Sequence, residues 1–357
     1  MPEVTGPRLI RDHTTLRLGG PARRWVTATT EAELVEAVAA ADDAGEPVLV
    51  LGGGSNLVVA DAGFDGTVVE VATRGIAADH EGDDPTCGGV LVTVAAGEDW
   101  DAFVAHAVER GWVGVEALSG IPGSVGATPV QNVGAYGQEV AQTVARVRVY
   151  DRLMKGVRTF AGPDCGFGYR HSRFKADRFR GGGRHVVLDV TFQLAVGGPH
   201  ALGAPIAYAE LARTLGVEPG QRAPVADVRT AVLGLRAGKG MVLDADDHDT
   251  WSAGSFFTNP VLPADQVPDG APAWPAGDGL VKTSAAWLIE HAGFGKGWAV
   301  EPGAPAGLST KHTLALTNRG EATTADLLAL ARAVRDGVQA AYAVTLVNEP
   351  VLLGCEL

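Results

Sequence analysis

The chain has 357 residues, a length that allows two or three domains with large buried cores. Its formal net charge is −13 and its basic residues are scattered singly, which argues against a nucleic-acid-binding face and against a basic membrane-binding patch. Hydrophobic residues make up 46% of the chain and charged residues only 20%, so an intrinsically disordered protein is excluded as well.

Membrane proteins and disulfide-stabilised proteins are also disfavoured. The chain contains no run of about 18 apolar residues and its first residues do not resemble a signal peptide, so we expect a cytoplasmic protein without membrane insertion. Cys87, Cys165 and Cys355 form no CxxC pair, and their odd number argues against a disulfide framework and a zinc site. We therefore expect free thiols and no bound metal.

The first third of the chain alternates predicted helices and strands. Thr30 and Glu33 have capping-box spacing, which predicts a helix that ends near Gly45. An apolar run predicts a strand at 48–51 that leads directly into a glycine-rich turn. β-Branched and apolar runs predict further strands at 57–59, 67–71 and 90–95. Apolar residues at helical spacing predict one more helix at 100–108.

A long tract from 117 to 137 has no helical or alternating period. It is rich in glycine and small polar residues, and such a long loop inside a compact domain is usually functional. Beyond it, strands at 144–150 and 185–194 enclose the tract CGFGYRHSRFK, and helices are expected at 207–215 and 225–235.

A second domain is expected to begin near Lys239, where the composition changes. An acidic segment at 244–249 is followed by a proline-rich surface excursion at 263–275. A short helix is expected at 285–292, and a long helix capped by Thr323 and Asp326 at 324–338. A strand at 344–347 is expected to present Glu349.

The turn Gly52–Asn56 is the first candidate binding site. Glycines at a strand end allow backbone amides to converge on an anion, as in phosphate sites. The match to known motifs is incomplete, because a Rossmann fingerprint needs glycine where Leu57 stands and no Walker lysine follows. A tight turn between two strands remains an equal explanation.

The tract 119–137 is the second candidate site. Asn132, Gly134 and Ala135 suit contacts with a phosphorylated cofactor, although a glycine-rich loop packed between domains would look similar. Two such loops that fit no standard nucleotide motif favour an unusual dinucleotide-binding fold.

Three single residues are candidates for catalysis. Arg170 lies in a basic and aromatic tract and offers a rigid fork for a carboxylate or an oxyanion, unless that tract is a solvated edge. Ser255 stands beside two phenylalanines as a possible proton donor or a turn residue, and Glu349 is either held at a cleft or on the surface. GxSxG and HExxH motifs are absent, so the residues alone indicate a cofactor-binding enzyme.

Taken in order, six tracts resemble the UDP-N-acetylenolpyruvoylglucosamine reductase (MurB) family, in its tyrosine-loop (type I) branch. The tracts are TTLRLGGPA at 14–22, LGGGSNLV at 51–58, GIPGSVGATPVQNVGAYGQE at 120–139, GYRHSRFK at 168–175, AGSFFTNP at 253–260 and NEP at 348–350.

The resemblance implies an α+β fold in which a two-lobed FAD-binding region of the vanillyl-alcohol-oxidase (PCMH) type precedes an α+β substrate-binding domain. The implied FAD-binding region consists of lobe 1 at 1–66 and lobe 2, which includes the tyrosine loop, at 67–238. The implied substrate domain follows at 239–345, and a C-terminal strand that carries Glu349 at 346–357.

The resemblance also assigns residues to roles. It implies that the FAD pyrophosphate binds at Gly52, Gly53, Gly54, Ser55 and Asn56. The flavin contacts it implies are Gly123, Ala127, Val130, Val133, Gly134 and Ala135. The substrate contacts it implies are Tyr136, Tyr169, Tyr208, Lys239 and Asn259, with Tyr208 closing over the substrate. It implies that Arg170 and Glu349 stabilise an enediolate while Ser255 donates a proton.

The implied activity is NADPH-dependent, FAD-mediated reduction of UDP-N-acetylglucosamine enolpyruvate to UDP-N-acetylmuramate, which serves peptidoglycan synthesis and thereby cell shape and division. FAD is expected to be noncovalent, because the glycine tracts contain no histidine for a covalent link, and the enzyme is expected to be a monomer. The alternatives are an FAD-dependent alcohol oxidase or dehydrogenase of the same fold, and a flavin-binding protein without enzymatic activity.

Overall fold

A computed structural model describes residues 8–80 and 89–357, so Cys87 lies outside the described residues. The chain forms two compact units. Of the described residues, 23–53 and 65–237 form the sheet unit, and 8–22, 54–64 and 238–357 form the C-terminal unit. The domains expected from the sequence are continuous stretches with boundaries after residues 66, 238 and 345, and they stay a prediction.

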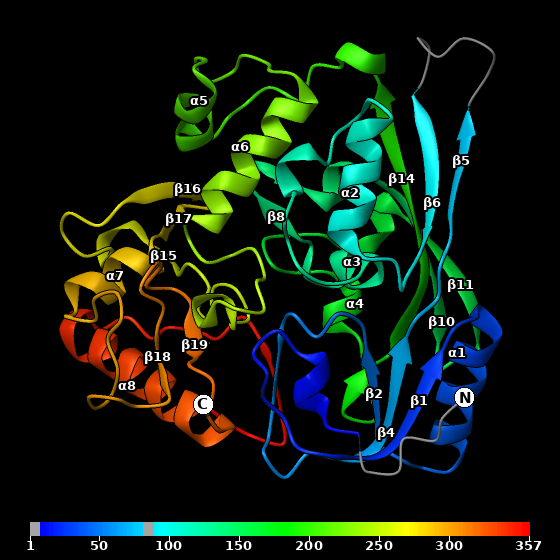
Figure 1. Ribbon diagram of the computed structural model, residues 1–357, viewed down its shortest axis with the longest axis horizontal. Helices are drawn as coiled ribbons and strands as arrows, with labels where there is room; N and C mark the ends of the chain where they lie inside the picture. Colours follow the sequence, from blue (N-terminus) through cyan, green and yellow to red (C-terminus); the bar gives the residue numbers. More distant parts are fainter. Residues whose placement is uncertain (1–7, 81–88) are drawn as a thin grey trace. The chain divides into compact units, whose positions relative to one another are not determined.

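The sheet unit contains a small three-stranded sheet in the order β1-β4-β2, with strands Ala22–Ala28, Phe64–Val71 and Val48–Leu51. Helix α1 (Glu31–Asp43) connects β1 to β2 (Figure 1). Its capping box is present, because the Thr30 hydroxyl accepts from the Glu33 amide and the Glu33 carboxylate accepts from the Thr30 amide, both at 3.2 Å. The helix predicted from the spacing of these two residues is thus confirmed.

A larger antiparallel sheet follows in the order β11-β10-β14-β6-β5, with β7 paired to β14. Its core lies under helix α2 (Trp100–Glu109), where Trp100 and Phe103 pack on Phe192 with ring centroids 5.9 and 5.1 Å away (Figure 1). The strands are β5 (Ile76–His80), β6 (Val90–Ala95), β7 (Trp112–Val113), β10 (Val144–Asp151), β11 (Gly156–Ala161) and β14 (His185–Val196).

Shorter elements complete the sheet unit. Its remaining helices are α3 (Thr128–Gln131), α4 (Arg173–Ala176), α5 (Ala209–Leu215) and α6 (Val225–Ala237). Two strand pairs are β8 (Gly134–Ala135) with β9 (Gln138–Glu139) and β12 (Arg178–Phe179) with β13 (Gly182–Gly183). The predicted helices at 207–215 and 225–235 are therefore confirmed within two residues.

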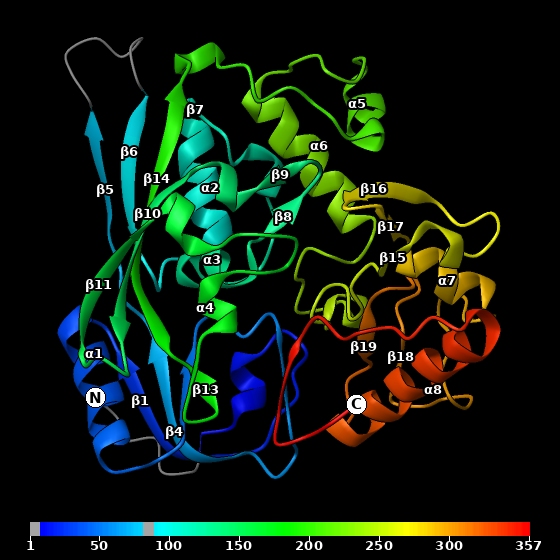
Figure 2. The same cartoon turned by 180° about the vertical axis from the view of Figure 1, so that it is seen from behind.

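The C-terminal unit is built around helix α8 (Thr324–Tyr342), which runs along the hairpin of β18 (Ala306–Leu308) and β19 (Leu316–Asn318) (Figure 2). Its core contains the fully buried Phe256 and Phe257 with residues of α7 (Ala285–His291). Early chain enters this core as well, since β3 (Leu57–Val59) pairs in parallel with β20 (Val351–Leu353).

Two expectations need correction. The strand expected at 344–347 is absent there; the strand is β20, and only Asn348 bridges to Phe257 before it begins. The proline-rich excursion is partly a sheet, in the order β15-β17-β16 with strands Val261–Pro263, Leu280–Thr283 and Ala273–Gly277. Pro263 and Pro275 lie on the two edge strands, where a missing N–H disrupts no ladder.

In residues 8–80 and 89–357, no helix combines the length and the apolar character that crossing a bilayer requires.

Candidate functional site

The two glycine-rich loops meet inside the sheet unit. A Cβ atom added to Gly53 would lie 2.7 Å from the Cα of Gly123, and one added to Gly52 would lie 2.3 Å from the Ser124 hydroxyl. These positions require glycine because the backbones approach more closely than a side chain allows. The structure thereby joins two candidate cofactor sites that are about 70 residues apart in the chain.

The first loop leaves backbone donors for an anion. In the described part of the chain, the amides of Gly53, Gly54 and Ser55 donate no hydrogen bond. Gly54 has a φ of +61°, and its carbonyl accepts from the Thr15 amide at 3.2 Å. Consecutive amides without a protein acceptor suit a phosphate or pyrophosphate group.

The second loop contains helix α3 and is tied to the basic tract. The Ser172 hydroxyl donates to the Val130 carbonyl at 2.7 Å, and the Asn132 carboxamide donates to the Gly168 carbonyl at 2.9 Å. Asn132 is almost fully buried and has a φ of +48°, a conformation that asparagine tolerates better than most residues. These bonds hold the two tracts together as one structure.

Arg170 extends from the basic tract toward the second glycine loop. Its guanidinium donates to the Gly134 carbonyl at 3.2 Å and lies 5.5 Å from the centre of the Tyr169 ring. Its φ is +51°, which is uncommon for a side chain of this size, and its carbonyl accepts from the Lys175 ammonium at 3.1 Å. The arginine is thus held in a defined position beside the loop expected to contact flavin.

The tyrosine loop, residues 202–224, is closed by a bridge between Leu202 and Pro224 and contacts the second glycine loop through Tyr208. This exposed residue precedes α5, and its ring lies edge-on to Tyr136 with centroids 5.4 Å apart. Tyr136 has a φ of +50°. At the end of α6, burial lowers the pKa of Arg236 to about 10, despite attraction from Tyr136 and Asp101. Two of the five expected substrate residues are therefore in direct contact.

Ser255 and Glu349 lie on paired segments of the C-terminal unit. The Glu349 amide donates to the Phe256 carbonyl at 2.8 Å, and Phe257 forms an antiparallel bridge with Asn348. Ser255 is half-buried beside the two buried phenylalanines. Residues 94 positions apart in sequence are brought together in this way, whereas Arg170 belongs to the sheet unit.

The remaining expected substrate residues are also in the C-terminal unit. The Asn259 carboxamide oxygen accepts from the Ala285 amide at 3.0 Å, which fixes the side chain at the start of α7. Lys239 is half-buried just after α6 and precedes Gly240, which has a φ of +65°.

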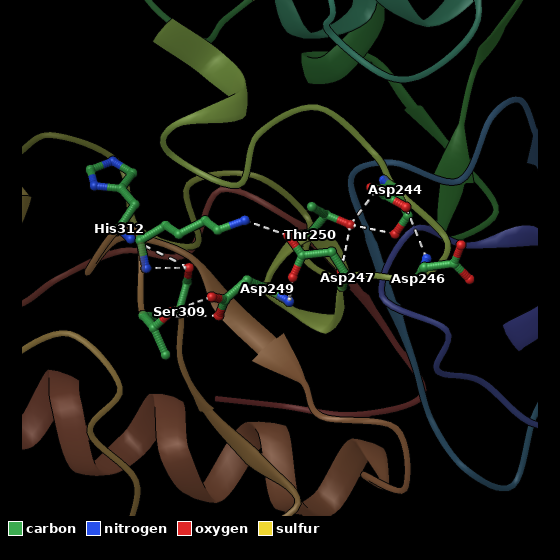
Figure 3. A network of polar contacts seen from close by, with 9 residues as sticks. Asp244, Asp246, Asp247, Asp249, Thr250, Ser309 and His312 are labelled. Carbon is green, nitrogen blue, oxygen red and sulfur yellow. Dashed lines mark hydrogen bonds and ion pairs between the residues drawn. The ribbon is translucent and has the colours of Figure 1, made fainter. Parts of the chain in front are cut away.

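The acidic segment 244–249, whose role the sequence left open, forms a loop clasped to residues 309–312 (Figure 3). Asp249 accepts from the Thr310 amide at 2.9 Å, and Asp247 pairs with Lys311. The hydrogen bond and charge of Lys311 hold the pKa of Asp247 below its usual value, and Asp247 raises the pKa of Lys311 in turn.

This clasp leads directly into the segment that carries Ser255. The Trp251 carbonyl accepts from the Asn318 amide at 3.0 Å, and the Ser252 carbonyl accepts from the Thr15 hydroxyl at 2.7 Å. The approach to Ser255 is therefore anchored at successive residues. The basic pair Lys311-His312 was the sequence signal for this clasp, because it is a plausible partner for an acidic segment.

An ion pair between helices α2 and α6 was also not predicted from the sequence. Arg229 on α6 donates to both oxygens of Asp101 on α2, at 2.6 and 2.9 Å, and Asp101 also accepts from the Gly120 amide at 2.6 Å. Burial pushes the pKa of Asp101 upward, but these hydrogen bonds and the arginine charge outweigh it and lower the pKa. The start of the second glycine loop is thereby fixed to two helices.

The chain is similar to known proteins along most of its length. Residues 246–353 match the profile of the UDP-N-acetylenolpyruvoylglucosamine reductase C-terminal domain, and residues 22–156 match that of an FAD binding domain. The UDP-N-acetylenolpyruvoylglucosamine reductase of Cutibacterium acnes is 60% identical over 344 residues, which cover 96% of this chain and 89% of that protein. The chain belongs to the UDP-N-acetylenolpyruvoylglucosamine reductase family. It is accordingly an oxidoreductase with an FAD-binding domain.

Other members of the UDP-N-acetylenolpyruvoylglucosamine reductase family agree. The protein of that name from Streptomyces coelicolor is 57% identical over 357 residues, covering 96% of this chain and 88% of the relative. The crystal structure of UDP-N-acetylenolpyruvylglucosamine reductase (MurB) from Thermus caldophilus covers 98% of both chains, with a TM-score of 0.64 and 26% identity. The α+β fold with an FAD-binding region of the vanillyl-alcohol-oxidase type is thus confirmed.

Proposed function

We propose that this protein reduces UDP-N-acetylglucosamine enolpyruvate to UDP-N-acetylmuramate with NADPH as the hydride donor, as a cytoplasmic monomer in peptidoglycan precursor synthesis. The observation that carries the proposal is the backbone pairing of the Ser255 segment with the Glu349 segment, in a member of a reductase family. This pairing provides a hydroxyl and a carboxyl group within one small region, as reduction of an enolpyruvyl group requires.

FAD would be held by the two glycine loops. Gly52, Gly53, Gly54, Ser55 and Asn56 would bind the pyrophosphate, since amides of this loop have no acceptor within the described chain. The flavin ring would contact Gly123, Ala127, Val130, Val133, Gly134 and Ala135. FAD, bound without a covalent link, would supply the capacity to carry a hydride from NADPH to the enolpyruvyl double bond.

The chain's own residues act on charge and protons. Addition of hydride to the terminal carbon of the vinyl ether leaves negative charge on the conjugated carboxylate, as an enediolate. Arg170 and Glu349 would stabilise that charge, the first as a permanent cation and the second through a hydrogen bond from its carboxyl group. Ser255 then donates its proton to the adjacent carbon, so one hydride and one proton complete the reduction.

The rest of the substrate would be bound by polar and aromatic side chains. Lys239 suits the diphosphate and Asn259 the sugar or its acyl group, while Tyr169 and Tyr136 offer hydroxyls and ring faces. Tyr208 would close over the bound substrate. Its exposure and its ring contact with Tyr136 suit a movable residue at the edge of a site.

The test uses Ser255→Ala in two half-reactions. Purified wild-type protein should be yellow, lose its colour with NADPH, and regain it when the enolpyruvyl UDP-sugar is added. The variant should lose colour normally but regain it at least about 100-fold more slowly, because a general acid contributes about that much. Thr230→Val, which removes an exposed hydroxyl from α6, is the control and should behave as wild type.

Four results would contradict the proposal. Normal recolouring of Ser255→Ala would remove the assigned proton donor. A colourless protein would show that FAD is not the cofactor. A yellow protein that NADPH does not bleach would show that NADPH is not the hydride donor. Rapid oxygen consumption with an alcohol would favour an oxidase instead.

A further inference from the structure

Glu116, to which no role has been assigned so far, is a buried carboxylate in the sheet unit. Its exposed fraction is 1%. One carboxylate oxygen accepts from the Gly114 amide at 2.7 Å, and the other accepts from the Gln138 carboxamide at 2.9 Å and the Ala204 amide at 2.8 Å. All three partners are neutral N–H donors, so both oxygens of the Glu116 side chain act only as hydrogen-bond acceptors.

Two of these donors belong to the segments that carry the contacting tyrosines. Gln138 is two residues after Tyr136, and Ala204 is four residues before Tyr208. The rings of Tyr136 and Tyr208 are also in contact, with their centroids 5.4 Å apart. The same two segments are therefore joined twice, once by hydrogen bonds to Glu116 and once by the rings. A shift of one segment at the carboxylate would therefore move one ring relative to the other.

The base of the tyrosine loop packs directly on the carboxylate. A Cβ atom added to Gly203 would lie 2.7 Å from the nearer oxygen of Glu116. The neighbouring backbone bonds, from the Gly203 amide to Ala223 and from the Ile206 amide to Gln221, stay within the loop itself. The bond from the Ala204 amide to Glu116 is therefore a tie between the loop and the rest of the sheet unit.

We propose that Glu116 is a positioning residue that sets the base of the tyrosine loop against the turn at 134–139, so that Tyr208 meets the UDP-sugar in the correct place. The proposal rests on the proposed function, since it assumes that Tyr208 contacts substrate. Glutamine cannot replace glutamate here, because its NH2 group would face at least one N–H donor and leave a buried group unpaired.

The first test compares Glu116→Gln with Glu109→Gln, which removes the same charge from an exposed position on α2. Glu116→Gln should speed hydrogen exchange of the amides at 203–208 and raise KM for the enolpyruvyl UDP-sugar about tenfold, the effect of losing one buried hydrogen bond. Reduction of flavin by NADPH should stay within about twofold of wild type, because Tyr208 is assigned to the UDP-sugar and not to NADPH. Glu109→Gln should change none of the three.

A second variant perturbs the same contact from the side of the loop. Gly203→Ala keeps the carboxylate but pushes it away from the Ala204 amide, and it should reproduce the faster exchange and the higher KM. This variant decides the matter if Glu116→Gln fails to fold.

The outcomes separate the two proposals. Unchanged exchange at 203–208 in both variants, or an equal loss of both half-reactions together with bound flavin, would overturn the positioning role. A wild-type enzyme that does not turn over the UDP-sugar would overturn the proposed function, and with it the link to substrate. The exchange measurement would still decide whether Glu116 holds the loop.

Discussion

At the scale of single residues, buried charge is concentrated where hairpins and loops are fixed. Asp151 ends β10 and is fully buried, yet both of its oxygens accept from the Arg184 guanidinium, at 2.8 and 2.7 Å. Burial pushes the pKa of Asp151 upward, but hydrogen bonds from Arg184, the Met154 amide and Arg158 outweigh it and hold the pKa well below the usual range. The charged form of Asp151 is therefore stabilised by folding.

Asp151→Asn should lower the free energy of unfolding at pH 7 by about 2 kcal/mol, because the half-buried Arg184 and the exposed Arg158 lose their charged hydrogen-bond acceptor. A carboxylate with a depressed folded-state pKa contributes stability above its unfolded value of about 3.9, and loses that contribution as the pH falls. The difference in Tm from wild type should thus be constant from about pH 5 to pH 8 and narrow below about pH 4. Melting curves across this range provide the measurement, with the exposed Asp164→Asn as control. A difference that is unchanged at low pH would contradict this account.

At the scale of elements, loops that the sequence leaves without regular structure are ordered by side-chain hubs. In the acidic loop, the buried Thr250 hydroxyl accepts from the Asp244 amide at 3.0 Å and lies 2.8 Å from the carbonyls of Asp244 and Asp247 (Figure 3). One hydroxyl thus closes the loop internally, while Asp247 and Asp249 clasp it to 309–312.

Thr250→Val keeps the shape of this side chain and removes only its hydrogen bonds. The variant should lower the free energy of unfolding by about 1–3 kcal/mol, the cost of leaving a buried amide and its acceptors unsatisfied. Urea unfolding supplies the free energy, and hydrogen exchange should be faster at 244–250. Thr230→Val, which removes an exposed hydroxyl from α6, should stay within about 0.5 kcal/mol of wild type. Equal effects at the two positions would show that the hub has no special weight.

At the scale of the whole molecule, the C-terminal unit depends on the beginning of the chain. Leu16 and Val58 are fully buried in its core, and β3 supplies the partner of β20. The Asn318 carboxamide donates to the Leu16 carbonyl at 3.1 Å, and the Thr324 hydroxyl donates to the Val59 carbonyl at 2.6 Å. The last 120 residues are therefore not expected to be self-sufficient.

A fragment of residues 239–357 should accordingly fail to unfold cooperatively on its own. Removal of the early segments opens the core at Leu16 and Val58 and leaves β20 without its strand partner. Far-UV circular dichroism during a thermal scan, with limited proteolysis, would measure this, and the full-length chain is the control. A sharp, protease-resistant transition in the fragment would contradict the assignment of these segments to the unit.

Local signals in the sequence predicted much of the secondary structure. The capping boxes at Thr30 and Thr323 predicted α1 and α8, because both partners of a capping box lie within one turn. The strand expected at 344–347 was wrong, since Val344 and Leu346 are buried by packing in the core without strand pairing and Val347 is exposed. Short apolar runs do not distinguish these two cases.

The candidate site divides in the same way. The sequence by itself determined the family, through six ordered motifs, and the residue types that suit an anion, a proton donor and a cation. Only the tertiary structure decided that Gly53 abuts Gly123, that the Ser255 segment pairs with Glu349, and that Glu116 joins the segments of Tyr136 and Tyr208. Each of these contacts links residues that are distant in the chain, and their energy depends on the close approach and burial of both partners, which no local pattern specifies.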